Sequence, residues 1–349
     1  MRIALLSDCP PLGLKVLYCL AMAGHWVAVI SLRQGSRLKN SRYRSEYLEI
    51  PDEGLERQAS VIKEYCGRKG IGMVLGDSIS SAGRLHELQG LLAPGLAYAP
   101  ESTERLSRIH DKWTFYSDFR EFFPMPRTNL LSAWEEIGED LLEHVGRPFL
   151  VKPREAESGH GVKVLNGADE LRSYLAEPGP HKELPVILQQ YVPGEDIGFS
   201  VLAENGRVLV WDTQRHGDGD VREFFALEEA RRVGFELVRH MSYSGPAHID
   251  MRRDPETGTV YALECNCRFW FTVTANAWTG INYPDLAARR HGSQIMESSF
   301  PGPLESTYFL PSTLLRKMKR PWGLSGVTRN NWRGLWQAVS DPLPHLLSH

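Results

Sequence analysis

Acidic, amide and basic side chains recur at every second position of one short segment, residues 261–268, which reads YALECNCR. If this segment is a β-strand, Glu264, Asn266 and Arg268 share one face, because successive side chains of a strand point to opposite sides. Leu263 and the two cysteines share the other face. One face is therefore rich in oxygen acceptors and ends in a cation, whereas the other is small and apolar.

A neighbouring segment, residues 247–251, adds a second carboxylate. As a strand it directs His248 and Asp250 to one side, and pairing through the intervening turn brings Asp250 close to Glu264 and Asn266. Two carboxylates and an amide oxygen are hard ligands that suit Mg²⁺ better than Zn²⁺. A polar strand face in solvent is the alternative. The three aromatic residues after the segment 261–268, which are Phe269, Trp270 and Phe271, favour a cleft instead.

A lysine and a glycine-rich loop form another candidate group. Lys152 closes the apolar strand 148–153, and a loop of small residues that includes 158–161 follows it. An ammonium group and the backbone N–H groups of such a loop can surround phosphate oxygens. An ordinary hairpin accounts for the same residues, so the segment alone leaves both interpretations open.

A polar segment at 189–196, which reads QQYVPGED, is the last of these groups. The strand expected at 186–192 stops at a Pro-Gly pair, and Glu195 and Asp196 follow at once. These acids could line an adenosine pocket. Taken alone, a plain turn with solvated acids is the favoured interpretation.

The elements that must position these groups fall into two patterns. The first hundred residues alternate strand-like and helix-like segments, which favours a parallel sheet of βαβ units. We expect strands at 3–6, 26–32 and 72–75 and helices at 12–23, 55–65 and 84–92. Neither G-x-G-x-x-G nor G-x-x-x-x-G-K-[ST] occurs, which argues against a dinucleotide fold or a P-loop.

From residue 107 the pattern changes to an α+β layout with mostly antiparallel strands. A helix is expected at 110–123. Further strands are expected at 148–153, 186–192, 199–203, 207–211, 247–251 and 260–269. The Asn-Gly pair at 205–206 is a strong hairpin signal. Arg215 and His216 follow this hairpin and would face a cleft covered by the sheet. Arg215 is a candidate clamp for a substrate carboxylate, although a solvent-exposed arginine fits equally well.

Taken together and in this order, the segments resemble the ATP-grasp superfamily, in its carbamoyl-phosphate-synthase-like or carboxylate–amine ligase branch. The match runs over roughly residues 107–292 and includes 111–113, 151–153, 158–161, 189–196, 248–250, 264–268 and 279–284. The resemblance implies an α/β and α+β fold. Its parts would be an N-terminal Rossmann-like pre-ATP-grasp domain at 1–106, a two-subdomain ATP-grasp fold at 107–300 and a basic, Trp-containing tail at 301–349. The lid subdomain would span about 113–188, and the metal and substrate subdomain about 189–300.

The resemblance also implies roles for individual residues in binding ATP. Lys112 and Lys152 would contact the phosphates. The residues that would fold over the phosphates are Ser158, Gly159, His160 and Gly161. Backbone groups near Tyr191 and Val192 would read adenine, and Asp196, or else Glu195, would hold the ribose. Gln189 would lie beside the adenine, and it and Gln190 replace acids that many members carry.

The same resemblance assigns the chemistry. Asp250, Glu264 and Asn266 would bind one or two Mg²⁺ ions, or Mn²⁺. Arg268, with Lys152, would stabilise the transferring phosphoryl group, and Arg268 would also contact the substrate. The implied reaction joins a carboxylic acid to an amine, an amino acid or ammonia through an acyl phosphate, with release of ADP and phosphate. A kinase acting on a small molecule and a non-catalytic nucleotide-binding regulatory protein are the alternatives.

Composition limits the partners. The chain has 349 residues and a formal net charge of −3, so it carries no overall basic signature for nucleic acid. Its five cysteines include no C-x-x-C pair, which favours a reduced, cytoplasmic compartment. We interpret Cys265 and Cys267 as core thiols. The sequence contains no apolar run long enough to span a membrane and no signal-peptide pattern at its start. The oligomeric state stays open, with a homodimer among the options.

The region 311–340 is basic and contains no acid. Its cations are Arg316, Lys317, Lys319, Arg320, Arg329 and Arg333, and Trp322, Trp332 and Trp336 are interleaved with them. We expect the tryptophans to pack on the body of the protein while the charges stay in solvent. Contact with an anionic partner or a membrane surface is the alternative.

Overall fold

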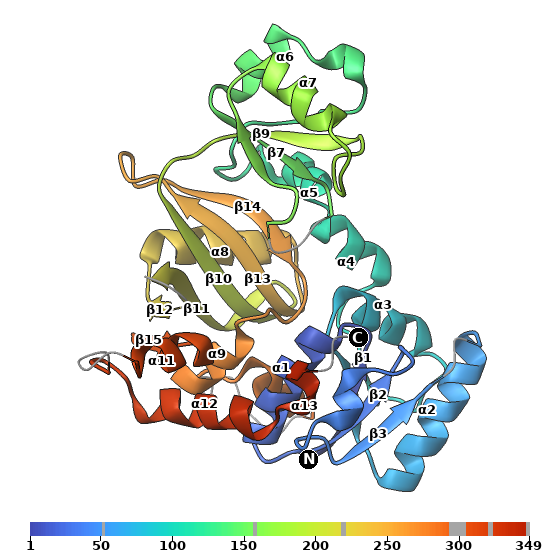
Figure 1. Cartoon of the computed structure of the whole chain (residues 1–349). Helices are drawn as coiled ribbons and strands as arrows, with labels where there is room; N and C mark the ends of the chain where they lie inside the picture. Colours follow the sequence, from blue (N-terminus) through green and yellow to red (C-terminus); the bar gives the residue numbers. More distant parts are fainter. Residues whose placement is uncertain (51–52, 156–158, 218–220, 293–304, 320–323, 347–349) are drawn as a thin grey trace.

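The computed structural model describes residues 1–50, 53–155, 159–217, 221–292, 305–319 and 324–346. Three sheets organise this part of the chain (Figure 1). The first is a five-stranded parallel sheet in the order β3-β2-β1-β4-β5. Its strands are β1 (Arg2–Ser7), β2 (Trp26–Ser31), β3 (Glu46–Glu49), β4 (Met73–Gly76) and β5 (Ala97–Tyr98).

Helices bury both faces of this sheet, which explains its almost unbroken apolar strands. Ile3 and Leu5 pack in the same core as α1 (Pro10–Met22), whereas Ala4 and Leu6 pack with α2 (Leu55–Lys69) and α3 (Ile79–Leu88). The three strands and the first two helices expected in this region are therefore confirmed, and the third helix, expected at 84–92, lies earlier, at Ile79–Leu88. The two edge strands were not predicted, because β5 has only two residues and β3 is a half-buried segment that reads EYLE.

The helix expected at 110–123 is the shorter α5 (Lys112–Phe119), and a separate helix that was not predicted, α4 (Thr103–His110), precedes it. Asp111 separates them in an extended conformation, with φ −66° and ψ 117°, and its Oδ1 accepts a hydrogen bond of 2.7 Å from the Thr114 N–H. This is an N-cap, which starts a new helix at Lys112. The break therefore gives Lys112 a fixed position at a helix N-terminus.

The second sheet has four antiparallel strands in the order β6-β9-β7-β8. They are β6 (Thr128–Leu131), β7 (Phe149–Pro153), β8 (Lys163–Leu165) and β9 (Val186–Gln190). Helices α6 (Glu139–Val145) and α7 (Ala168–Ala176) cover one face and share a core with the strands. The short 3₁₀ turn η2 (Trp134–Glu136) lies between β6 and α6, whereas the turn η1 (Arg37–Asn40) connects β2 and β3 of the parallel sheet. In Figure 1 this layer forms the end of the molecule farthest from the N-terminus.

The third sheet has six antiparallel strands in the order β14-β13-β10-β11-β12-β15. They are β10 (Glu195–Glu204), β11 (Arg207–Gly217), β12 (Val221–Phe225), β13 (Gly245–Arg253), β14 (Val260–Asn266) and β15 (Ser306–Phe309). Helix α8 (Glu228–His240) packs on one face. Asn205 and Gly206 form the predicted hairpin turn, with φ values of 51° and 77°. Strand β14 ends three residues earlier than expected.

The last part of the chain is joined to the rest by specific contacts. Helices α9 (Val273–Thr279) and α10 (Tyr283–His291) precede β15, and α11 (Pro311–Lys317), α12 (Arg329–Ser340) and α13 (Leu343–Leu346) follow it. Strand β15 pairs with β12, and the buried Asp341 accepts hydrogen bonds of 3.0 Å from the Tyr18 hydroxyl and 2.6 Å from the Ser41 hydroxyl. Within the described ranges, no helix is both long and apolar enough to cross a membrane.

The expected packing of the tryptophans is wrong for Trp336, whose exposed fraction is 70%, and Trp332 is 39% exposed. Trp322 and Arg320 lie outside the described residues. The interpretation of Cys265 and Cys267 as core thiols is confirmed, since both are buried in the core under β13 and β14. Hydrogen bonding with Cys267 and burial together raise the pKa of the Cys265 thiol well above its ordinary value.

Candidate functional site

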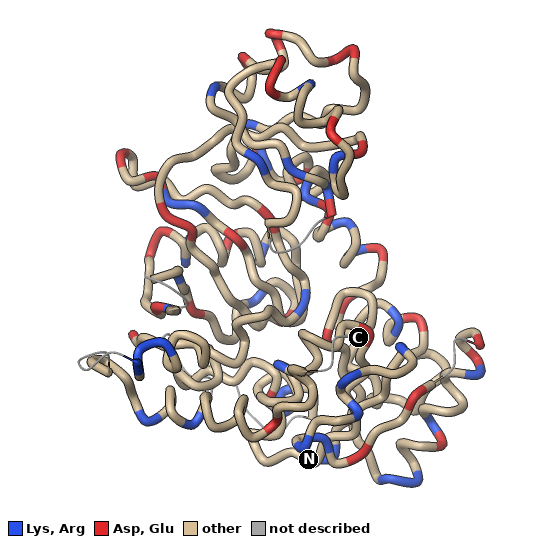
Figure 2. The backbone as a smooth tube through the Cα atoms, in the orientation of Figure 1, with Lys and Arg blue, Asp and Glu red and all other residues tan. Residues whose placement is uncertain are grey.

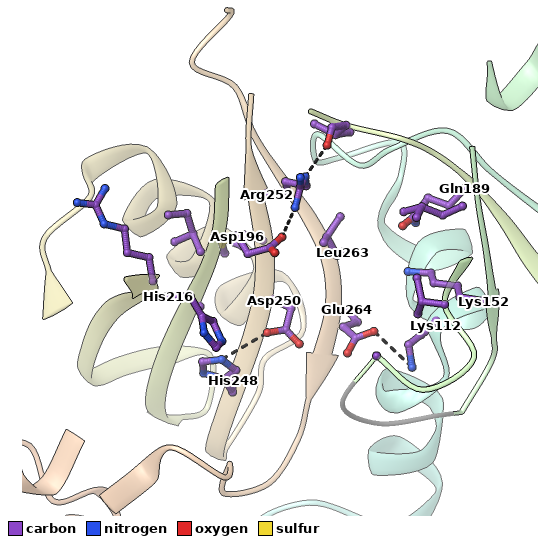
Figure 3. A pocket seen from close by; sticks show the side chains of 18 of the residues that line it. Lys112, Lys152, Gln189, Asp196, His216, His248, Asp250, Arg252, Leu263 and Glu264 are labelled. Atoms are coloured by element: carbon purple, nitrogen blue, oxygen red, sulfur yellow. Dashed lines mark hydrogen bonds and ion pairs between the residues drawn. The ribbon is translucent and has the colours of Figure 1, made fainter. Parts of the chain in front are cut away.

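A cleft of about 700 Å³ lies between the four-stranded and six-stranded sheets (Figure 3). Most of the residues singled out in the sequence line it. They are Lys112, Lys152, Gly159, His160, Gln189, Tyr191, Val192, Asp196, Arg215, Asp250 and Glu264. In Figure 3, Lys112, Lys152 and Gln189 face Asp250 and Glu264 across this space. Residues that are far apart in the sequence, from Lys112 to Glu264, therefore meet in one cavity.

The acid pair forms by direct strand pairing. Asp250 on β13 lies opposite Glu264 on β14, as the alternation and the turn predict. A β-bulge follows at once, because Met251 pairs with Ala262 and leaves Leu263 as the extra residue. Leu263 lines the cleft as a result. The expectation that Leu263 shares the core-facing side of Cys265 is therefore wrong, and the bulge is the reason.

The two carboxylates influence each other. Burial raises the pKa of Glu264, and the neighbouring Asp250 raises it further, whereas Lys112 and Lys152 lower it. Burial also acts against ionisation of Asp250, but its hydrogen bond with His248, the charge of His248 and that of Arg268 bring the Asp250 pKa below its ordinary value. The Asp250 side chain is still 40% exposed toward the cleft. The pair thus concentrates negative charge where a ligand can reach it.

These residues fit a divalent cation. Two accessible carboxylates held side by side repel each other, and a cation between them removes the repulsion. Among the residues with described positions, no group of three His, Cys, Asp or Glu side chains suits a metal. The pair would therefore share the ion with an amide oxygen, water or phosphate oxygens, as is typical of Mg²⁺. Asn266 is adjacent, with its Nδ2 3.0 Å from Asp250 Oδ2.

Two lysines form the opposite wall. Lys112 Nζ lies 3.3 Å from Glu264 Oε2 and donates a hydrogen bond of 3.4 Å to the Arg154 carbonyl. Arg154 in turn pairs with Asp111 at 2.8 Å, which holds the start of α5 against the end of β7. Burial lowers the pKa of Lys152 to about 8, with Glu264 opposing and Lys112 adding to the shift. Two cations this close to each other suit a polyanionic ligand.

The polar segment at 189–196 contacts an arginine, Arg252, that the sequence reasoning did not single out. Arg252 donates hydrogen bonds of 2.5 Å to the Val192 carbonyl and 2.5 Å to Asp196 Oδ1, and its guanidinium lies 5.8 Å from the centre of the Tyr191 ring. Arg252 follows His248 and Asp250 at the same two-residue spacing on β13, so the alternation could have identified it. Gln189 is buried, and its amide donates a 3.0 Å hydrogen bond to Thr128.

Several expected site residues lie outside the lining of the cleft. Gln190 accepts a hydrogen bond of 3.2 Å from the Arg127 N–H, and Glu195 forms an ion pair of 2.8 Å with Arg215. Gly161 has φ +74°, and a Cβ there would lie 2.8 Å from His181 Cβ, so glycine is required. Ser158 falls outside the described residues.

The two arginines expected at the substrate differ in placement. Arg215 lines the cleft, but its guanidinium is held by Glu223 at 2.7 Å as well as by Glu195. Arg268 does not line the cleft, since β14 ends at Asn266 and the strand alternation no longer applies. It is buried, donates a 2.8 Å hydrogen bond to the Phe269 carbonyl and lines a small neighbouring cavity of about 30 Å³. Strand alternation therefore does not place Arg268 on the face of Glu264, although its charge still acts on Asp250.

The part of the chain that contains Lys112, Lys152, Asp250 and Glu264 is similar to known proteins. Residues 109–269 match the ATP-grasp domain family. A D-alanine–D-alanine ligase of Petrotoga mobilis is 28% identical over 173 residues, which cover 50% of this chain and 53% of the relative. The chain thus spans about half the length of that relative.

Solved structures share the fold. An L-amino acid ligase from Bacillus licheniformis superposes with a TM-score of 0.63 at 17% identity, over 86% of this chain and 77% of its own. The ADP complex of N5-carboxyaminoimidazole synthetase from Staphylococcus aureus gives a TM-score of 0.67 at 12% identity, over 91% and 85%. At these identities the likeness concerns the fold. Both matches extend well beyond residues 109–269.

Proposed function

Because the chain belongs to the ATP-grasp superfamily, we propose that it is an ATP-dependent ligase that joins a carboxylic acid to an amine, an amino acid or ammonia. The observation that carries the proposal is the cleft in which Lys112 and Lys152 face Asp250 and Glu264. Similarity to a D-alanine–D-alanine ligase supports carbon–nitrogen bond formation. The substrates are an acid and an amine of small-molecule size.

The cleft suits the binding of MgATP. Lys112 and Lys152 would neutralise the phosphates, while Asp250 and Glu264, with Asn266, would hold Mg²⁺, which supplies further charge neutralisation at the phosphates. The segment from Gly159 to Gly161 and Ser158 would cover the phosphates. Tyr191 and Val192, with Gln189 and Gln190 alongside, would contact adenine. Asp196 would hold the ribose, with Glu195 as the alternative.

The reaction needs that neutralisation, because a carboxylate must approach a triphosphate of the same charge. The substrate oxygen would form a bond to the γ-phosphorus, and the bond between that phosphorus and the ADP oxygen would break. The amine would then attack the acyl carbon, inorganic phosphate would leave, and the amine would lose a proton to solvent. Arg268, which lowers the Asp250 pKa from outside the cleft, would act on the site electrostatically, and Arg215 would orient the substrate carboxylate.

The proposal extends to the organisation of the chain. The parallel sheet at 1–106 would be a Rossmann-like pre-ATP-grasp domain, followed by the ATP-grasp domain at 107–300 and a C-terminal segment at 301–349. The order β3-β2-β1-β4-β5, with helices on both faces, supports this division. The four-stranded sheet would be the lid subdomain.

A screen of carboxylic acids against amines, with ADP and phosphate as the readout, tests the function. We expect ADP release that requires both an acid and an amine, together with an amide product. ADP formed with a stable phosphorylated product and no amine requirement would identify a kinase instead. AMP as the product would contradict the acyl-phosphate route, and binding of ATP without turnover over a broad screen would indicate a regulatory protein.

A further inference from the structure

A surface of helix α12 combines exposed aromatic and cationic side chains. Trp336, Val339 and Trp332 have exposed fractions of 70%, 55% and 39%, and Arg329 and Arg333 are exposed beside them. We call these five residues the aromatic–basic surface. Exposed indole rings are uncommon on a protein surface without a partner. The exposure of these side chains therefore indicates that the surface binds a partner.

Helical geometry places these side chains together. Trp332, Trp336 and Val339 follow the spacing i, i+4, i+7, so they form one stripe along the helix. Arg329 and Arg333 are four residues apart and flank it. The opposite side of α12 is filled, because Asn331, Gly334 and Leu335 are buried and a Cβ on Gly334 would lie 2.0 Å from the Tyr308 hydroxyl. The orientation of the stripe toward solvent is therefore fixed by packing.

The charge around the surface has one sign. In the sequence from 306 to 346 the only acid is Asp341, which is buried and accepts hydrogen bonds from Tyr18 and Ser41. The neighbouring helix α11 carries two further basic positions in its last turn, Arg316 and Lys317, and Figure 2 marks basic positions along both helices. Beside the stripe lies an open groove of about 590 Å³, bordered by Met22, Tyr43 and Trp278. An anionic occupant with an apolar layer complements such a surface.

We propose that the aromatic–basic surface binds the surface of an anionic lipid bilayer. Indole rings prefer the boundary between headgroups and acyl chains, where the ring is apolar and the N–H stays hydrated. Arginine side chains next to them pair with anionic headgroups. In Figure 1, α12 lies along the edge of the molecule opposite the four-stranded sheet, so a docked bilayer leaves the cleft open to its substrates.

A second copy of the chain fits this surface less well. A two-fold contact through α12 brings the same patch against itself. Arg329 and Arg333 of one copy would then approach the same arginines of the other, with no acid on α12 to pair with them. Like charges in a partly desolvated contact are unfavourable. Charge complementarity therefore favours the bilayer.

Vesicle co-sedimentation of the full chain tests the proposal. Vesicles of phosphatidylcholine with phosphatidylglycerol should bind the protein, vesicles of phosphatidylcholine alone should bind it weakly, and high salt should release it. The double substitution Arg329→Glu and Arg333→Glu should weaken binding by more than about thirtyfold, the factor expected for removing two positive charges alone, because the new acids also repel the anionic lipids. Trp336→Ala should weaken it by roughly tenfold, and tryptophan fluorescence should shift to the blue only with the anionic vesicles.

Matched controls come from exposed residues elsewhere. Arg57→Glu with Arg68→Glu removes two arginines from the solvent face of α2, whose side chains are 61% and 64% exposed. Phe122→Ala removes a ring that is 61% exposed. These variants should bind vesicles like the wild type. All variants should keep the circular dichroism and nucleotide binding of the wild type, and Trp336→Ala provides a second test if the arginine variant fails to fold.

Several results would overturn the proposal. These are no binding to anionic vesicles, equal binding to both vesicle types, or equal losses in the α12 and control variants. A protein mass that rises with concentration and falls in Trp336→Ala would assign the surface to a second copy. Binding of heparin that competes with vesicles and is insensitive to Trp336→Ala would assign it to a soluble polyanion.

Discussion

Two pairs of acids in this protein lie in contrasting surroundings. Asp8 and Asp77 follow β1 and β4 in the parallel sheet, where Asp77 has no exposed surface and accepts hydrogen bonds of 2.5 Å from Ser7 and 2.9 Å from Ser81. Asp250 and Glu264 lie in the cleft, with side chains that are 40% and 23% exposed. Both pairs hold close carboxylates, but only the second borders the cleft and has lysines beside it, with Lys112 Nζ 3.3 Å from Glu264 Oε2.

The two pairs therefore differ in packing: neighbouring side chains enclose the first, whereas the second is open to the cleft, and this opening is the basis of its proposed role. The carboxyl ends of β1 and β4, where helices leave to opposite faces, are where a ligand often binds in a parallel sheet. Here the protein fills that position itself, because a Cβ on Gly13 would lie 2.6 Å from Asp77 Oδ2. The hydroxyl groups of Ser7 and Ser81 donate hydrogen bonds to the two carboxylate oxygens of Asp77. In the cleft, Asp250 and Glu264 also have polar partners, but their side chains stay partly exposed to the cavity that they line.

The largest expected effect is on turnover. Glu264→Gln should lower the rate of ADP release by a thousandfold or more, because it removes a metal-binding charge from the reaction centre. The variant keeps the shape of the side chain and should keep its fold. Asp77→Asn is the matched control and should retain a rate within a few-fold of the wild type. Equal losses in both variants would erase the distinction between the two acid pairs.

The next effect is on stability and concerns Asp77. Burial raises the Asp77 pKa to about 7 from 3.8, and Asp8 adds to the shift while hydrogen bonds from Ser7 and Ser81 oppose it. Between these two values the folded protein binds a proton that the unfolded chain does not, so stability falls as pH rises through this window and levels off above about 7. Over the whole window, the proton bound by Asp77 changes the free energy of unfolding by about 4 kcal/mol. Urea unfolding at pH 5 and pH 8 should show this pH dependence reduced in Asp77→Asn.

A smaller effect is expected on nucleotide affinity at Lys152. Lys152→Met should weaken ATP binding by about ten- to a hundredfold, which is the usual value of a hydrogen bond to a charged group. Since the Lys152 pKa is lowered to about 8 in the free protein, the ammonium is present below that pH and is lost above it. ATP affinity of the wild type should therefore fall as pH rises through about 8. Lys152→Arg, measured by calorimetry, should bind ATP with little pH dependence, and a persistent dependence would point to another group.

The smallest effect is expected at the exposed edge of the cleft. Asp196→Ala should lower ATP affinity by about fivefold, the value of one hydrogen bond to a ribose hydroxyl. It should leave the affinity for an analogue without ribose hydroxyls unchanged. An equal loss for both nucleotides would mean that Asp196 acts through its ion pair with Arg252 rather than on the sugar.

Local patterns were sufficient for part of the site. Strand alternation and a turn predicted that Asp250 and Glu264 would meet, and a strand ending in Lys-Pro placed Lys152. Nothing local reveals the bulge at Leu263, because the extra residue depends on pairing with β13. The expected helix began at residue 110, next to the N-cap at Asp111, but the preceding helix α4 was not predicted.

Tertiary contacts explain the remaining differences. Arg252 is found by alternation, but its bond to the Val192 carbonyl depends on how two sheets meet. Arg268 lies beyond the last residue of β14, so periodicity could not place it. The exposure of Trp336 is a property of how α12 packs, since Gly334 and Leu335 occupy the inner side of the helix. From the sequence alone, we expected the tryptophans of this region to pack on the body of the protein.

The most direct test is a crystal structure with Mn²⁺ and a non-hydrolysable ATP analogue, in which anomalous scattering locates the metal. We expect a manganese peak bound by the carboxylates of Asp250 and Glu264, with the triphosphate between that ion and Lys112 and Lys152. A nucleotide seated beside Asp8 and Asp77, or a nucleotide in the cleft with no metal at Asp250 and Glu264, would contradict the central claim.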